Sequence, residues 1–114
     1  ICVVSHSFDE NIRRDYAENG LPEPDAVFGW EQPPERRKPN PWPLEEIMRR
    51  LGLAPEELLM IDDLKPGFDM AHSCGVDFAA AGWAYDVPQI EDFMRRNSDF
   101  YFKTVQELAD FLGE

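Results

Sequence analysis

The chain has 114 residues, which is enough for one small domain with a single hydrophobic core. Its formal net charge of -12 argues against nucleic acid as a partner, because phosphate backbones are bound by clustered Lys and Arg. No stretch approaches the roughly 20 apolar residues that a membrane-spanning helix requires, so a membrane is not an expected partner either.

The first part of the chain predicts two buried strands separated by a helix. The strands are expected at residues 1–4 and 26–28, where short apolar runs occur. The helix between them carries Ile12 on its apolar face, and Asp9 or Ser7 is expected to cap its N-terminus.

The middle of the chain combines a proline-rich segment with three further elements. Five prolines between residues 31 and 43 predict an extended loop. An amphipathic helix is expected at residues 44–51, with acids in its first turn and arginines in its last. Residues 58–61 then predict a strand, and residues 67–74 predict a helix.

The last part of the chain continues the alternation of strands and helices. A strand is expected at residues 78–81, a short helix at about 90–95 and a strand at 100–102. Thr104 and Glu107 form a capping box for a final helix. The expected fold class is therefore α/β, with a parallel, doubly wound sheet.

Two adjacent carboxylates, Asp62 and Asp63, follow the apolar strand at residues 58–61. In parallel sheets, chemistry is carried out beyond the carboxyl ends of the strands. Adjacent acids repel each other there and call for a cation, and hard oxygen ligands suit Mg²⁺. The alternative is an acidic turn in which one aspartate caps the helix that begins at Gly67. The pair alone does not decide between these interpretations.

Other polar residues complement this pair. Ser5 follows the first strand and Lys38 lies in the proline-rich loop. A serine hydroxyl can hydrogen-bond phosphoryl oxygens, and a lysine supplies positive charge. His6 is either a substrate contact or a strand-end histidine with a structural bond. Arg36 and Arg37 either line an entrance for an anionic substrate or form a solvated loop face.

Three stretches carry these groups, in the order ICVVSHS, RKPNPWPLEEIMRRLGL and IDDLKPGFDMAHSCGV. They resemble the second, third and fourth motifs of the haloacid dehalogenase (HAD) superfamily of phosphoryl-transfer enzymes. The fourth has the form found in beta-phosphoglucomutase-like members, and the C-terminal part is similar to the ends of phosphoglycolate phosphatase-like members. The resemblance implies a Rossmann-like HAD core that extends over residues 1–114.

The resemblance also implies a role for each candidate residue. Ser5 and Lys38 would be catalytic groups that bind the phosphoryl group, with His6 beside them in the substrate site. Asp63 would ligate Mg²⁺, the expected cofactor, and Asp62 would ligate or orient it. The implied function is a Mg²⁺-dependent phosphatase of a small phosphorylated metabolite that acts through an aspartyl-phosphate. A phosphomutase and a non-catalytic phosphate- or protein-binding module are the alternatives.

One part of the family pattern is missing. The first motif is an apolar strand ending in Asp-x-Asp, which supplies the nucleophile and the general acid and base, and no Asp-x-Asp occurs in this chain. The family places that strand between those expected here at residues 1–4 and 58–61. Because the chain opens within an apolar run at Ile1, we expect an N-terminal segment of the same protein, carrying this motif and a helical cap, as a partner. The chain alone is expected to be an incomplete, inactive core domain.

The two cysteines indicate in which cellular compartment the protein is expected. Cys2 and Cys74 fall on a predicted strand and a predicted helix, where they are expected to behave as small buried hydrophobes. This pattern suits a reducing compartment, so a cytoplasmic location is expected.

Overall fold

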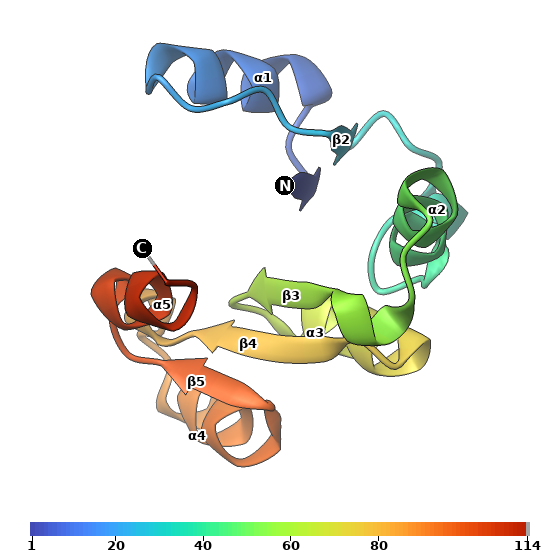
Figure 1. Cartoon of the computed structure of the whole chain (residues 1–114). Helices are drawn as coiled ribbons and strands as arrows, with labels where there is room; N and C mark the ends of the chain where they lie inside the picture. The colour runs from blue at the N-terminus through green and yellow to red at the C-terminus, as the bar shows by residue number, and fades with distance from the viewer. Residues whose placement is uncertain (114) are drawn as a thin grey trace.

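The structure is a computed structural model that describes residues 1–113, in which strands and helices alternate for most of the chain (Figure 1). The strands are β1 (Cys2–Val4), β2 (Ala26–Phe28), β3 (Leu59–Asp62), β4 (Asp77–Ala81) and β5 (Phe100–Phe102). The α-helices are α1 (Asp9–Glu18), α2 (Trp42–Leu51), α3 (Lys65–Cys74), α4 (Pro88–Asn97) and α5 (Val105–Phe111). The predicted α/β class is confirmed.

Every strand pair is parallel, but the strands form two separate sheets. One sheet contains β1 and β2, and the other has the order β3-β4-β5. Within residues 1–113, no strand pairs with the second edge of β1 or of β3. The predicted parallel sheet is therefore present in two pieces, with an interruption between β1 and β3 (Figure 1).

Helices cover both faces of the three-stranded sheet. Phe78 of β4 packs against Phe68 of α3, with ring centroids 5.4 Å apart. Phe100 of β5 lies on the opposite face, because Phe100 is in register with Ala79, and it packs against Phe111 of α5 at 4.8 Å. This arrangement is the doubly wound, Rossmann-like architecture that the sequence predicts.

The helix α2 connects the two sheets through its apolar face. Its first turn begins at Trp42, two residues before the predicted start, so Pro43 is helical and does not belong to the extended loop as predicted. Proline fits there because the first-turn N–H groups have no partner within the helix. The buried core cluster draws on both sheets and on three helices: Ala26, Phe28, Leu44, Ile47, Met70, Ala71, Val76, Phe78, Ala80 and Met94.

The predicted caps are only partly correct. Phe8 is the N-cap of α1 and makes no side-chain cap, so neither Asp9 nor Ser7 caps this helix as predicted. A carboxylate distant in the sequence takes this role, because Glu31 accepts a hydrogen bond from the Asp9 N–H at 3.0 Å. Local spacing cannot reveal such a partner.

No helix in residues 1–113 is long and apolar enough to cross a membrane.

The cap of α5 agrees with the prediction in one of its two bonds. Thr104 is the N-cap, and its Oγ1 accepts a hydrogen bond from the Glu107 N–H at 3.1 Å. The Glu107 carboxylate accepts from the Lys103 N–H at 2.7 Å, one residue before the position that a capping box requires.

Candidate functional site

The adjacent carboxylates lie where β3 ends and α3 approaches it. Asp62 is the last residue of β3, and α3 begins at Lys65 with Leu64 as an N-cap that makes no side-chain bond. The interpretation in which one aspartate caps this helix is therefore wrong. Asp62 Oδ1 instead accepts a hydrogen bond from the Asp63 N–H at 2.7 Å, which fixes the orientation of its carboxylate.

Gly67 allows α3 to approach this carboxylate closely. It lies in the first turn of α3, not at the helix start as predicted. A Cβ atom at Gly67 would lie 2.7 Å from Asp62 Cγ, and still closer to Asp62 Oδ2. Any side chain at this position must therefore displace Asp62. The sequence marked Gly67 as a helix signal and gave no indication of this contact.

Lys38 neutralises one of the two carboxylates. Its Nζ atom lies 2.7 Å from Asp62 Oδ2, and the two side chains are only 14% and 12% exposed. Lys38 belongs to the loop between β2 and α2, where it precedes a cis peptide bond to Pro39. With Oδ1 bound to the Asp63 N–H and Oδ2 to Lys38, Asp62 is suited to orienting its neighbours.

Asp63 has no such neutralising partner among residues 1–113. Burial raises the pKa of its carboxyl group, and the hydrogen bond and negative charge of Asp62 raise it further. The Tyr85 hydroxyl is close enough to respond to the charge of Asp63. It is buried, and it has no hydrogen-bond partner within residues 1–113. Burial, followed by the negative charge of Asp63, raises the pKa of Tyr85. The positive charge of Lys38 offsets only part of the rise in the pKa of Asp63, so this carboxyl group remains without full charge compensation.

These residues fit a magnesium ion, although they do not complete a cage for one. Asp63 offers hard carboxylate oxygens, which Mg²⁺ prefers, in a place where a cation would relieve repulsion. Within the described residues, no group of three or more His, Cys, Asp and Glu side chains is arranged to hold a metal. Further ligands would have to come from elsewhere in the protein, from substrate or from water.

Ser5 and His6 lie on the other sheet, at the carboxyl end of β1. The Ser5 N–H donates to the Phe28 carbonyl at 3.0 Å, which holds the loop against β2. The Ser5 hydroxyl accepts from the Ser7 N–H at 3.0 Å. The His6 ring stands edge-on to Trp30, with centroids 5.7 Å apart. Ser5 makes no hydrogen bond to the Lys38 and aspartate group among residues 1–113.

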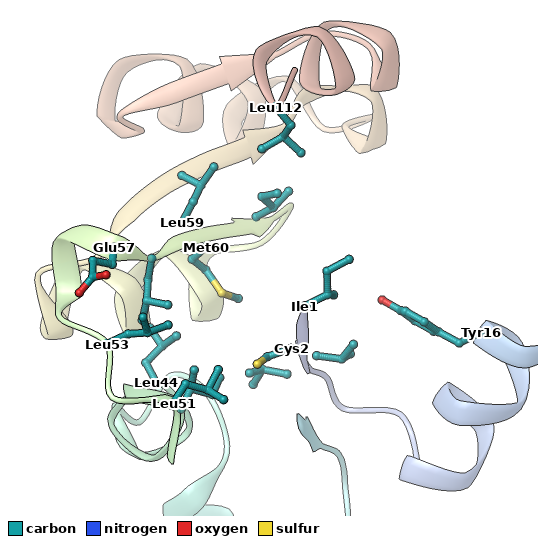
Figure 2. Close-up of a pocket in the computed structure, with 15 residues that line it drawn as sticks. Ile1, Cys2, Tyr16, Leu44, Leu51, Leu53, Glu57, Leu59, Met60 and Leu112 are labelled. Atoms are coloured by element: carbon teal, nitrogen blue, oxygen red, sulfur yellow. The ribbon is translucent and has the colours of Figure 1, made fainter. Parts of the chain in front are cut away.

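A pocket of about 510 Å³ lies between the unpaired edges of β1 and β3. Figure 2 shows Ile1 and Cys2 on one side of this pocket and Leu59 and Met60 on the other. Val3 and Val4 of β1 and Ile61 of β3 also border it, and helices and loops complete its lining with Tyr16, Leu44, Ile47, Leu51, Leu53, Glu57, Leu58 and Leu112. The lining is mostly apolar, so this pocket is suited to a hydrophobic chain segment and not to a charged ligand.

Sequence reasoning gave little weight to one feature beside Ser5. The Arg37 guanidinium stacks on Trp30, with Cζ 3.6 Å from the ring centroid, and Arg36 lies 4.8 Å from the centroid of Trp42. The consecutive arginines in an acidic chain were the available signal, but sequence spacing could not pair them with these rings.

Comparisons with known proteins agree with this architecture. Residues 1–81 match the family model described as haloacid dehalogenase-like hydrolase. Pyrophosphatase PpaX from Halalkalibacterium halodurans is 34% identical over 80 residues, which are 69% of this chain and 36% of that protein. The crystal structure of a predicted phosphoglycolate phosphatase from Haemophilus somnus 129pt has a TM-score of 0.78 and 20% identity over 97% of this chain. It shares the fold, and this chain spans 48% of its length.

Proposed function

Because this chain belongs to the haloacid dehalogenase-like hydrolase family, we propose that it is part of a Mg²⁺-dependent phosphatase of a small phosphorylated metabolite. The observation that carries the proposal is the Lys38–Asp62 ion pair beside the unneutralised Asp63, at the carboxyl end of a parallel sheet. Phosphoryl transfer requires positioning and charge neutralisation, and these residues supply both. We call the longer polypeptide, which would contain this chain and an N-terminal segment with the first motif, the parent protein.

Each candidate residue has a distinct task in this proposal. The Ser5 hydroxyl and the backbone N–H groups of its loop hydrogen-bond the phosphoryl oxygens. Lys38 places a positive charge beside the phosphoryl group, and Asp62 holds the Lys38 ammonium group in position. Asp63 would ligate Mg²⁺, which when bound neutralises charge on the phosphoryl oxygens. His6 lies at the edge of the same loop, where it contacts the substrate.

The nucleophile is proposed to lie outside this chain. An aspartate carried by a segment that precedes Ile1 would attack phosphorus and form the aspartyl-phosphate as the P–O bond to the leaving alcohol breaks and that oxygen takes up a proton. Water would then hydrolyse the aspartyl-phosphate and release phosphate. The pocket between β1 and β3 supports this proposal, since it is bordered by two unpaired parallel edges and by apolar side chains. One inserted strand would satisfy both edges and would end beside Ser5 and Asp63.

The substrate and location are also proposals. The resemblance to a pyrophosphatase makes pyrophosphate the second candidate substrate beside a phosphate monoester. The free cysteines Cys2 and Cys74 support a cytoplasmic location. A phosphomutase and a non-catalytic phosphate- or protein-binding module remain as alternative outcomes. Transfer of phosphate to a sugar acceptor would favour the mutase, and phosphate binding without turnover would favour the module.

The experiment compares phosphatase activity of the parent protein and its variants on a generic phosphate ester. Lys38→Ala and Asp63→Asn should each lower kcat by about a hundredfold or more, because each removes charge stabilisation of the transition state. Lys65→Ala and Asp69→Asn are matched controls, because these residues form a largely exposed ion pair on α3, with Lys65 Nζ 3.1 Å from Asp69 Oδ2. Undiminished turnover by both site variants would refute the proposed mechanism.

A further inference from the structure

Arg36 and Arg37 are the two arginines that lack an acidic partner within residues 1–113. The other arginines all lie within ion-pair distance of a carboxylate: Arg13, Arg14, Arg49, Arg50, Arg95 and Arg96. The chain carries 23 acidic residues against 11 basic ones, so carboxylates are abundant. Two neighbouring guanidinium groups held apart from them are available to bind another anion.

Of these two, Arg37 has the more defined environment. Its guanidinium lies 3.6 Å above the centre of the Trp30 ring, and its Nη1 atom is buried without a hydrogen-bond partner. A buried donor without an acceptor is costly, and no oxygen of the described residues removes that cost. Stacking occupies the face of the guanidinium and leaves its N–H groups directed outward in the plane of the group. That geometry suits a carboxylate or a phosphate.

The Trp30 ring also brings Arg37 into contact with the loop that carries Ser5. The backbone N–H of Trp30 donates a hydrogen bond to the Ser7 carbonyl at 2.9 Å, and the His6 ring packs edge-on against the Trp30 ring. Arg37 is also the immediate neighbour of Lys38 in the chain. The Arg37–Trp30–His6 group therefore adjoins the loop that carries Ser5, and the backbone of Arg37 leads directly into Lys38. Trp30 is 46% exposed and open to solvent.

We propose that Arg37, stacked on Trp30 and flanked by His6, binds a second anionic group of the substrate. The preferred substrates would then be small molecules that carry a phosphoryl group and one further phosphate or carboxylate. This inference rests on the proposed phosphatase function, because it assumes that Ser5 and Lys38 bind the reacting phosphoryl group. Lys38 supplies charge to that group, and Arg37 selects what is attached to it.

The test measures kcat/KM of the parent protein for two substrate pairs that differ in the second anion. One pair is 2-carboxyethyl phosphate and propyl phosphate, and the other is pyrophosphate and methyl phosphate. In Arg37→Gln, the preference for the doubly anionic member should fall roughly ten- to hundredfold, as expected for loss of a charged hydrogen bond. Arg37→Lys should retain part of the preference. The first pair measures recognition of a carboxylate as the second anion, and the second pair measures recognition of a phosphate.

Arg36→Gln is the matched control, because Arg36 is an exposed neighbour that stacks on Trp42 instead. It should leave the preference unchanged. Equal losses for both members of each pair in Arg37→Gln would overturn the proposal and leave Arg37 with a purely structural role. An unchanged preference in Arg37→Gln would overturn it as well.

A binding measurement separates failure of this inference from failure of the proposed function. If the parent protein hydrolyses none of these compounds, the function fails, and the anion subsite is tested by titration of Trp30 fluorescence with pyrophosphate and with methyl phosphate. Tighter binding of pyrophosphate that is lost in Arg37→Gln supports the subsite. Equal affinities for the two anions, or tighter binding of pyrophosphate that persists in Arg37→Gln, overturn it.

Discussion

Lys38 Nζ lies 2.7 Å from Asp62 Oδ2, so the loop after β2 is bound directly to the last residue of β3. The ion pair therefore joins the two separate sheets at the end where the candidate residues gather. Both side chains are largely covered, and neither charge can be solvated fully if the other is removed.

This pair should show strong coupling in a double-mutant cycle. Lys38→Met and Asp62→Asn should each destabilise the parent protein by about 2–4 kcal/mol, and the double variant by less than their sum, with a coupling of about 1–3 kcal/mol. The free energy of unfolding in urea provides the measurement. The exposed Lys65–Asp69 pair serves as control, with an expected coupling of about 0.3–0.5 kcal/mol. Additive effects at Lys38 and Asp62 would contradict the assigned role.

Gly67→Ala should damage the site through packing alone. The added methyl group meets the Asp62 carboxylate, so α3 or Asp62 must move at a cost of about 1–3 kcal/mol. Phosphatase activity should fall with it, because Asp62 then no longer holds Lys38. Ser73→Ala on the same helix removes only an exposed hydroxyl bond to the Asp69 carbonyl and should change stability by less than about 0.5 kcal/mol. Equal stability and turnover of Gly67→Ala and the unmodified protein would show that the close approach does not matter.

The raised pKa of Asp63 should make the folding stability of the metal-free protein depend on pH. Its pKa is raised in the folded state, so folding favours the protonated carboxyl group. With metal removed by chelation, the contribution of Asp63 to stability should therefore decline as pH rises from the ordinary range of a carboxyl group through this raised pKa. Asp63→Asn should remove that decline and stabilise the metal-free protein at neutral pH.

Thermal unfolding of both proteins, with and without Mg²⁺, measures these effects. Added Mg²⁺ should raise the Tm of the unmodified protein and leave that of Asp63→Asn nearly unchanged. Asp69→Asn is the control, because its carboxylate is paired with Lys65 in an exposed position. A Tm increase of the same size in Asp63→Asn would exclude Asp63 as a ligand.

Residues 1–114 prepared alone should associate or unfold and should show no phosphatase activity. The unpaired edges of β1 and β3 expose backbone groups that each cost about 1–3 kcal/mol when buried unsatisfied, against a typical total stability of 5–15 kcal/mol. Weak metal binding is also expected, since Asp63 is a single open ligand. Size-exclusion chromatography with intact-mass measurement tests this. A monomer of 13.2 kDa that unfolds cooperatively would contradict it.

Sequence patterns predicted those elements that depend on local periodicity. The strands at Ala26–Phe28 and Phe100–Phe102 match the expected ranges, because short apolar runs bounded by polar residues have few alternatives. Helix starts were less accurate, since Pro43 and Pro66 are accommodated inside first turns and were interpreted as loop residues or left outside the helix. Such differences shift a boundary without changing the fold.

Contacts between distant residues were not predictable in the same way. The sequence suggested Lys38 and Asp62 as parts of one site, but not that Lys38 would engage the first aspartate and leave Asp63 without a partner. The Arg37–Trp30 stack and the approach of Gly67 to Asp62 also depend on how loops meet in space. Spacing along a chain does not encode these distances. The roles of Ser5 and His6 remain predictions.

The interruption between β1 and β3 has a consequence for how activity could evolve. Ser5 and Asp63 directly follow strands of different sheets, so their separation is set by whatever occupies the space between them. Neighbouring strands lie about 4.8 Å apart, and an inserted strand would fix the two edges at about twice that distance. The bulk and twist of that strand would then act as a spacer. Substitutions in it could change the active-site dimensions, and with them the substrates accepted, while Ser5, Lys38, Asp62 and Asp63 stayed the same.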